Sequence, residues 1–294
     1  MIYEDAQMPE IQPDDVLIKV KATSINPIDW KVREGARNDP ARHFPIILGW
    51  DVSGIIEKVG EKVKNFKVGD AVYGRPDTTR NGTYAEYVAV RAGEIAPKPQ
   101  SLDHNQAAAI PLAGLTAWQG IFDHGKLEAG QKILIHGASG GVGTLAVQLA
   151  KWKGAYVIGT SSAKNIDFLR KLGADEVIDY EKEHFEEKLH DIDVVFDTIG
   201  GDVQLNSLRV LKPGGILVST VGIKDEAAVK AKGIQGIAYG AKSLPEQLHR
   251  MAQLIDEGKL KPVIEKTLPL EEAAEAQRES QKGHTRGKIV LMVD

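Results

Sequence analysis

The chain of 294 residues contains no cysteine. It therefore forms no disulfide, has no thiolate to offer a metal and carries no cysteine nucleophile. Histidine and carboxylate are the remaining metal ligands, but the eight histidines form neither a His-x-x-x-His pair nor a His-Glu-x-x-His motif. We expect no metal site in this chain.

Long apolar runs are also missing. Stretches such as DVVFDTIG and GILVSTVG fall well short of the ~20 residues that a membrane-spanning helix needs. The first ten residues, MIYEDAQMPE, are acidic and do not look like a secretory signal. A net charge of -4 gives no basic surface for nucleic acid. We predict a soluble cytoplasmic protein with neither a membrane nor a nucleic-acid partner.

The pattern along the chain predicts an α/β protein with two kinds of domain. Residues 16–90 contain short β-branched segments separated by Gly, Pro, Asn and Asp, which is typical of a turn-rich β-barrel. After residue 130, near-continuous apolar segments such as KILI and YVIG alternate with amphipathic helical stretches. That alternation predicts a doubly wound parallel sheet with helices on both faces. The C-terminal part combines helical segments with a last strand, GKIVLMV.

A glycine-rich segment, HGASGGVG, lies between the first apolar segment of the second half and the helix that follows it. Glycines at such a place permit a tight turn and bring backbone amides close to a pyrophosphate at the helix N-terminus. The alternative is a packing turn without ligand. The strand before, the helix after and a second strand further on favour dinucleotide binding, with the cofactor contacts assigned to Gly140, Gly141, Val142 and Gly143.

The next strand, in AYVIGTSSAKN, lacks the acidic residue that usually binds the adenosine ribose of NAD. In its place the sequence has Ser161 and Lys164, and Tyr180 follows the strand after that. Hydroxyl groups and an ammonium bind a 2′-phosphate that a carboxylate would repel. These three residues predict NADPH as the cofactor. The alternative for Lys164 is a solvated lysine at a helix start.

Motifs along almost the whole chain resemble those of the zinc-independent medium-chain dehydrogenases/reductases of the NADPH:quinone oxidoreductase type. They include SINPIDWKVREG, GWDVSGIIEKVG, NGTYAEYV, PLAGLTAWQGI, HGASGGVG, LGADEVIDY and LKPGGILV. The resemblance implies a GroES-like catalytic domain in residues 1–107, a Rossmann domain in 108–245 and a return to the catalytic domain in 246–294. Family members begin with a further strand and a turn similar to GGPEVL, so we expect this barrel to lack its first strand, which bears on its activity.

The resemblance also implies the chemistry. Zinc-dependent relatives have a cysteine where this chain has Asn26 and a histidine where it has Trp50. Without a Lewis acid, hydride transfer to an electron-poor acceptor is favoured: a quinone, or an α,β-unsaturated ketone or aldehyde. Two alternatives stay open, an enoyl-thioester reductase and a non-catalytic NADPH-binding sensor or interaction protein. The resemblance further implies a homodimer through the edges of the Rossmann sheets.

Such a reduction develops negative charge on oxygen, which a positioned donor stabilises. The resemblance points to Lys31 and Asn26 in NPIDWK as these catalytic donors. The alternatives are a surface Lys31 paired with Asp29, and an Asn26 that bonds backbone in a turn.

The resemblance assigns further residues to the site, and for the three aromatic residues among them packing is the alternative. Trp50, Tyr73 and Tyr84 are the predicted substrate-pocket residues. Three residues are predicted to approach the nicotinamide: Thr116, Val221 and Gly222. For Thr116 the alternative is a helix cap. Residues 236–243 resemble the loop that closes over the cofactor.

Overall fold

A computed structural model describes residues 1–35 and 45–293. The chain divides into two compact units, one made of Met1–Leu115 with Ser243–Asp294 and the other of Thr116–Lys242. The sequence placed the corresponding boundaries at 107/108 and 245/246. Each unit is built around its own sheet, in agreement with the predicted combination of a GroES-like domain and a Rossmann domain.

The first unit contains a seven-stranded sheet in the order β12-β13-β1-β2-β3-β5, with β4 also paired to β1. Its pairings are antiparallel except for β12 with β13. Because β13 from the C-terminus pairs with β1, the tail of the chain completes the N-terminal sheet. The strands are β1 (Asp15–Ser24), β2 (Val52–Val59), β3 (Ala71–Gly74), β4 (Tyr87–Arg91), β5 (Ile95–Pro97), β12 (Ile264–Pro269) and β13 (Lys288–Met292).

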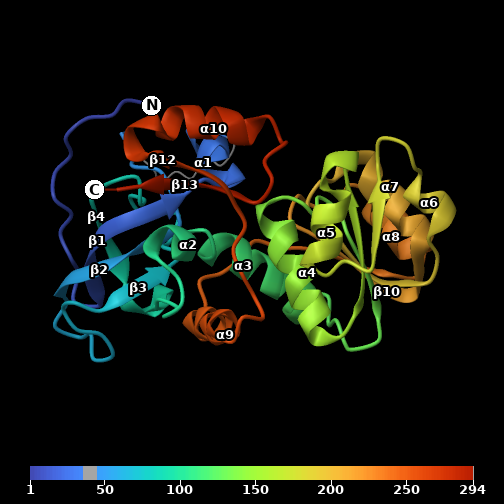
Figure 1. Ribbon diagram of the computed structural model, residues 1–294, viewed down its shortest axis with the longest axis horizontal. Coiled ribbons are helices and arrows are strands. Elements are labelled where there is room, and N and C mark those ends of the chain that lie inside the picture. The colour runs from blue at the N-terminus through green and yellow to red at the C-terminus, as the bar shows by residue number, and fades with distance from the viewer. Residues whose placement is uncertain (36–44, 294) are drawn as a thin grey trace. The chain divides into compact units, whose positions relative to one another are not determined.

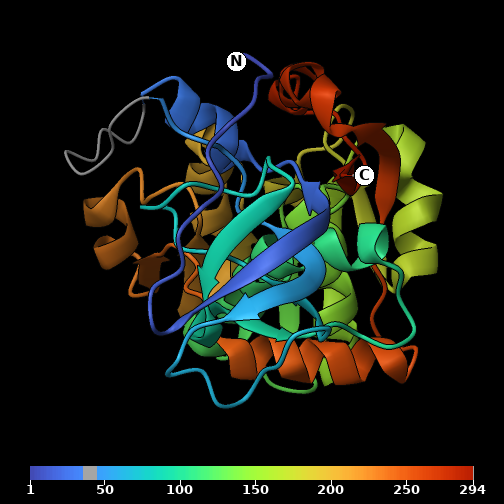
Figure 2. The same ribbon diagram turned by 90° about the vertical axis from the view of Figure 1, so that its left-hand side faces the viewer.

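The core of this unit follows from strand alternation. Val16, Ile18 and Val20 point to one face of β1, since successive side chains of a strand alternate, and they pack with Ile56 and Ile289. In Figure 2, which turns this unit toward the viewer, the long helix α9 runs along the lower side of the strands, and it packs against β5. The helical segments are α1 (Pro27–Arg33), η1 (Ala92–Glu94), α2 (His104–Ala108), α3 (Pro111–Trp118, which continues into the second unit), α9 (Pro245–Asp256), η4 (Leu270–Glu272) and α10 (Ala273–Gln281).

The second unit has six parallel strands in the order β11-β10-β9-β6-β7-β8. The strand order reverses between β6 and β9, and open sheets of this kind bind ligands at the carboxyl end of such a switch point. The strands are β6 (Lys132–Ile135), β7 (Tyr156–Ser161), β8 (Glu176–Asp179), β9 (Ile192–Asp197), β10 (Leu211–Ser219) and β11 (Gln235–Ala238).

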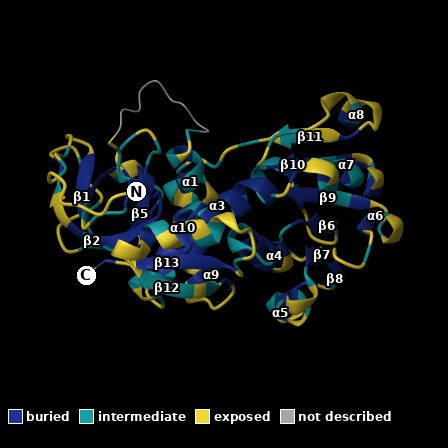
Figure 3. Ribbon diagram, turned by 90° about the horizontal axis from the view of Figure 1, so that it is seen from above, coloured by how far each residue is buried: buried dark blue, intermediate teal, exposed yellow. Residues whose placement is uncertain are grey.

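Helices cover both faces of this second sheet, as the sequence predicted. Figure 1 shows α4 and α5 on one face and α7 and α8 on the other. Figure 3 shows that the central strands are buried, whereas the outer sides of α5, α6 and α8 are exposed. The helical segments are η2 (Gln119–His124, a π-helix), α4 (Gly141–Lys153), η3 (Ala163–Asn165), α5 (Ile166–Leu172), α6 (Phe185–Lys188), α7 (Gly201–Val210) and α8 (Glu226–Ala231). Within residues 1–35 and 45–293, every helix is too short or too polar to cross a bilayer.

Candidate functional site

The glycine turn between β6 and α4 has the geometry that phosphate binding requires. Gly137 has a φ of +67°, in the left-handed region that favours glycine. A Cβ on Gly143 would lie 2.2 Å from the Gly137 carbonyl oxygen, so only glycine lets the first turn of α4 pack on the loop. On Gly140, the helix N-cap, an added Cβ would meet only that same oxygen, at 3.4 Å. The loop therefore packs closely against α4 at Gly143 and leaves space beside the N-cap residue Gly140.

The first amides of α4 suit an anion. Thr144 N–H donates to the carbonyl of Gly140 at 2.9 Å, which marks the first intrahelical bond. Gly141, Val142 and Gly143 precede it, so their amides have no carbonyl one turn earlier within the helix. They lie at the positive end of the helix dipole, which attracts negative charge. The predicted set of loop residues therefore gathers at one point, and it fits a pyrophosphate.

At the end of β7, the structure brings two of the three predicted 2′-phosphate residues together. Ser161 is buried, and its hydroxyl donates to the Ser162 carbonyl at 3.2 Å. The Tyr180 N–H donates to the Ser161 carbonyl at 3.2 Å, while the Tyr180 side chain is exposed. Lys164 is exposed in the short helix η3, three residues after Ser161. The assignment of these residues to a 2′-phosphate stays a prediction.

A carboxylate that the sequence reading did not consider lies opposite Ser161. Asp179 is its register partner on β8. One Asp179 oxygen accepts the Glu181 N–H at 3.2 Å, and the other lies 3.8 Å from the Lys182 ammonium. This acid is thus engaged by the turn that follows its own strand.

The residues assigned to the nicotinamide are each held by a neighbour in the second unit. Val221 N–H donates to the Ser219 hydroxyl at 3.2 Å, and the carbonyl of Gly222 accepts from the side chain of Gln204 at 2.8 Å. The carbonyl of Thr116 accepts from the Tyr239 hydroxyl. Tyr239 belongs to the predicted cofactor loop, so residue 116 and this loop are in direct contact.

That loop is fixed by a second side chain as well. Gln119 donates to the Lys242 carbonyl and accepts from the Lys242 N–H, both at 2.9 Å. A Cβ on Gly120 would lie 2.5 Å from the Tyr239 hydroxyl oxygen, so glycine at 120 allows this close approach. The sequence reading missed Gln119 and Gln204, because an isolated glutamine carries no motif.

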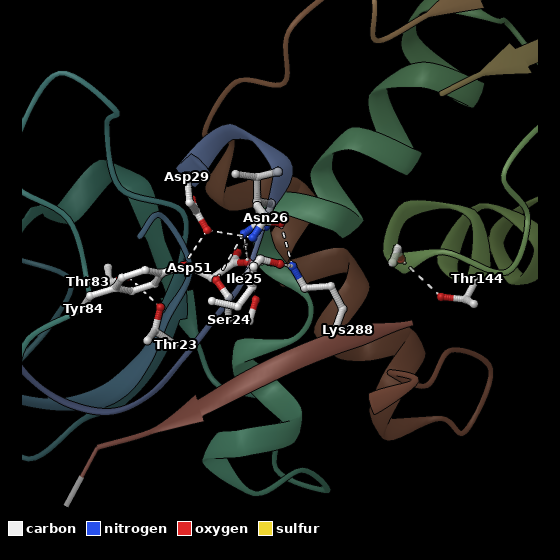
Figure 4. A network of polar contacts seen from close by, with 12 residues as sticks. Thr23, Ser24, Ile25, Asn26, Asp29, Asp51, Thr83, Tyr84, Thr144 and Lys288 are labelled. Carbon is white, nitrogen blue, oxygen red and sulfur yellow. Dashed lines mark hydrogen bonds and ion pairs between the residues drawn. The ribbon is translucent and has the colours of Figure 1, made fainter. Parts of the chain in front are cut away.

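In the first unit, Asn26 lies inside a closed polar network (Figure 4). Its amide nitrogen donates to Asp51 Oδ2 at 2.7 Å and to the Ser24 carbonyl at 3.4 Å, and its Oδ1 accepts from Lys288 Nζ at 2.6 Å. The side chain is 2% exposed. Both amide hydrogens of Asn26 are thus directed at protein acceptors.

Lys288 and Asp51 form the centre of that network. The ammonium of Lys288 donates to the Ile25 carbonyl at 2.7 Å and lies 3.3 Å from Asp51 Oδ2. Asp51 also accepts from the Ser24 hydroxyl at 2.6 Å and from the Leu112 N–H at 2.6 Å. This buried ion pair ties together β1, β2, β13 and the start of α3. The sequence offers no local signal for it, because its partners are 237 residues apart.

Asp29 caps α1 rather than pairing with Lys31. Its Oδ2 accepts the Asn26 N–H and the Tyr84 hydroxyl, each at 2.7 Å. Complete burial raises the pKa of Asp29 to about 7, although both donors oppose the shift. The Lys31 ammonium instead lies 5.4 Å from the centre of the Trp30 ring, and the Lys31 side chain is half-buried. Among the described residues, it forms no ion pair.

The three predicted substrate-pocket aromatics are packed in the first unit. Trp50 is fully buried in a cluster with Val32 and Leu48. Tyr73 is fully buried too, and its hydroxyl donates to the Leu248 carbonyl of α9 at 2.6 Å. Tyr84, partly buried, is bonded to Asp29 as described. Their role toward a substrate stays a prediction.

Within residues 1–35 and 45–293, no group of three or more histidine and carboxylate side chains is placed to bind one metal ion.

Two family models match separate parts of the chain. The family described as an alcohol dehydrogenase GroES-like domain matches residues 12–100, and the one described as a zinc-binding dehydrogenase matches residues 172–291.

Individual relatives cover nearly the whole chain. The mouse mitochondrial NAD(P)H oxidoreductase RTN4IP1 is 38% identical over 96% of this chain and 82% of its own length. A chloroplastic NADPH-dependent alkenal/one oxidoreductase of Arabidopsis thaliana is 37% identical over 97% of this chain and 73% of its own.

A solved structure shows the same likeness. The quinone oxidoreductase from Coxiella burnetii superposes with a TM-score of 0.94 at 37% identity, over 99% of this chain and 94% of that one. Together with the GroES-like and Rossmann units and the glycine turn, these matches show that the chain belongs to the medium-chain dehydrogenase/reductase family, in its quinone oxidoreductase branch.

Proposed function

We propose that this chain transfers hydride from NADPH to a quinone or to the β-carbon of an α,β-unsaturated ketone or aldehyde. The observation that carries the proposal is the glycine turn of residues 137–143, whose open cap and helix amides stand at the switch point of a parallel sheet. The names of the relatives point to the same reaction class.

The residues of the second unit account for cofactor binding. The amides of Gly141, Val142 and Gly143 bind the pyrophosphate. Ser161, Lys164 and Tyr180 select the 2′-phosphate, and the Lys182 ammonium, 3.8 Å from Asp179 Oδ2, partly offsets the charge of that nearby carboxylate. When bound, the reduced nicotinamide supplies the hydride.

Lys31 stabilises the negative charge that develops on the acceptor oxygen. The amide hydrogens of Asn26 are directed at Asp51 and Ser24, so we assign Asn26 to the polar network of the first unit and Lys31 to the acceptor. The Lys31 ammonium lies over the face of Trp30, forms no ion pair within residues 1–35 and 45–293, and is partly exposed, so it is available to an oxyanion.

Assembly and location are further parts of the proposal. The strand β11 stands at the edge of its sheet and pairs with β10 on one side. An unpaired strand edge is a template for another strand, which supports a homodimer through β11. We keep the cytoplasmic location as a prediction; the names of two relatives place those proteins in mitochondria and chloroplasts.

The test is oxidation of NADPH and, in parallel, NADH by the full chain with four acceptors: benzoquinone, phenanthrenequinone, an alkyl vinyl ketone and an enoyl thioester. We expect turnover of the quinones or the enone with a strong preference for NADPH. Turnover of the thioester alone would establish the enoyl-thioester alternative. Tight NADPH binding without any turnover would establish the non-catalytic alternative.

A further inference from the structure

A buried carboxylate organises the two loops that follow β9 and β10. Asp197 is the last residue of β9 and is fully buried. Its Oδ1 accepts the N–H groups of Ile199 and Gly200, both at 2.9 Å. Its Oδ2 accepts the Gln204 side-chain amide at 2.7 Å and the Ser219 hydroxyl at 3.0 Å. The four donors are neutral, so the negative charge is held entirely by oriented dipoles.

Gln204 extends this network into the loop after β10. Its Nε2 donates to the Gly222 carbonyl at 2.8 Å, and its Oε1 accepts the Lys224 N–H at 2.7 Å. The side-chain amide therefore bonds the loop backbone as a neighbouring strand would. Asp197 in turn fixes the direction of the Gln204 amide, because a carboxylate accepts from nitrogen and not from oxygen.

The two loops held in this way expose apolar side chains. Ile199 is 56% exposed and Val221 is 44% exposed. A Cβ on Gly137 would lie 3.2 Å from Ile199 Cδ1, and one on Gly200 would lie 2.9 Å from Val221 Cγ2. These side chains thus form an apolar rim beside the glycine turn. Apolar groups left uncovered next to a polar turn are typical of a ligand-contacting surface.

The sheet order says which half of a dinucleotide meets this rim. The predicted 2′-phosphate residues follow β7 and β8, on one side of the switch point between β6 and β9. The loops of Asp197 and Gln204 follow β9 and β10, on the other side. Because the two halves of a dinucleotide bind across the switch point, this rim meets the nicotinamide half.

We propose that Gln204, oriented by Asp197, is the positioning residue for the nicotinamide half of the cofactor: it fixes the loop of Val221 and Gly222 so that the Ile199–Val221 rim is formed before the cofactor binds. The inference rests on the proposed function and deepens it. Substituting a residue with this role should weaken the binding of ligands that reach the rim. It should leave unchanged the binding of ligands that occupy only the adenosine side.

The test compares two ligands on the full chain. NADPH reaches both sides of the switch point, whereas adenosine 2′,5′-bisphosphate occupies only the adenosine side. For Gln204→Leu, which is one atom shorter and removes the side-chain hydrogen bonds, we expect the NADPH dissociation constant to rise about tenfold, the loss of ~1.4 kcal/mol of binding. The constant for the bisphosphate should stay within about twofold of wild type.

Ser207→Ala is the matched control. Ser207 lies on the same helix as Gln204, is fully buried, and bonds the His136 ring at 2.9 Å and the Val203 carbonyl at 2.7 Å. It should leave the affinities for both ligands unchanged. Ser219→Ala, which removes one donor to Asp197 and the acceptor of Val221 N–H, serves if Gln204→Leu does not fold, and should weaken NADPH alone by a smaller factor.

A second variant separates positioning from a change in side-chain size. Gln204→Glu keeps the size but puts a carboxylate oxygen where the amide donates to Asp197 and to the Gly222 carbonyl, so it should weaken NADPH binding at least as much as Gln204→Leu and again spare the bisphosphate. An equal loss for both ligands, or none for either, would overturn the inference. If wild-type protein fails to bind NADPH, the proposed function itself fails.

Discussion

Two fully buried carboxylates, Asp51 in the first unit and Asp197 in the second, hold their charge in opposite ways. Asp51 has an ammonium beside it, supplied by Lys288 from 237 residues away. Among the described residues, the donors to the Asp197 carboxylate are neutral, and its side-chain partners lie 7 and 22 residues away. The first network joins distant strands and so builds the unit, whereas the second directs two adjoining loops. A buried polar cluster therefore does not by itself mark a binding site. The segments that its residues hold in place determine whether the cluster builds the fold or shapes a site.

The largest effect is expected from breaking the ion pair of the first unit. Lys288→Met leaves Asp51 and Asn26 without their cationic partner, and uncompensated buried charges cost about 3–5 kcal/mol. Urea unfolding should show this loss. Lys266→Met is the control, because Lys266 pairs with Glu279 at the surface, where such pairs contribute about 0–1 kcal/mol. Equal losses for the two variants would contradict the role given to Lys288.

The next largest effect is expected from the glycine turn. It concerns the affinity for the cofactor rather than the stability of the first unit. Gly143→Ala forces a Cβ to within 2.2 Å of the Gly137 carbonyl oxygen, so the loop must move away from α4. Losing one or two charge-assisted amide contacts should weaken NADPH binding about a hundredfold. Gly93→Ala adds a Cβ with nothing within 4 Å and should change nothing. Fluorescence titration of NADPH measures both.

The stability of the first unit should depend on pH through the ionisation of Asp29. Its pKa is raised from 3.8 to about 7, so the folded state binds this proton more tightly than the unfolded state does. The stability that Asp29 contributes is therefore fully present below about pH 4 and is lost as the pH rises through about 7. Asp29→Asn keeps an acceptor for Tyr84 and removes the titration.

The corresponding measurement is urea unfolding of both proteins at pH 5 and pH 8. The wild type should lose of order 2 kcal/mol more than Asp29→Asn between these values. Parallel behaviour of the two proteins would show that Asp29 does not titrate in this range.

The smallest effect concerns the choice between cofactors. Lys164→Ala removes the ammonium assigned to the 2′-phosphate and should reduce the NADPH-over-NADH ratio of kcat/KM about tenfold. Lys171→Ala, another exposed lysine on the following helix, is the control. A ratio that is unchanged in Lys164→Ala would remove this residue from the cofactor site.

The sequence predicted those features that are encoded locally. Strand alternation, the glycine turn and the missing acid after β7 depend on neighbouring residues, and the resemblance supplied the domain bounds and the return of the C-terminal part to the first domain. The partners of Asn26 could not be predicted from local sequence, because Lys288 and Asp51 are 237 residues apart. Gln204 and Asp197 were missed for another reason: they act by orienting backbone groups, which leaves no distinctive residue pattern. The alternative that paired a surface Lys31 with Asp29 is wrong in its partner, because Asp29 accepts from the Asn26 N–H and the Tyr84 hydroxyl.

The most direct test of the central claim is to follow the hydride itself. The full chain would be supplied with NADPH deuterated at C4 of the nicotinamide, on each face in turn, together with an enone that it reduces. If hydride passes directly to the electron-poor carbon, one of the two labelled cofactors gives a product with a single deuterium at the β-carbon. Product that contains only solvent hydrogen at that carbon with both labelled cofactors would contradict the account.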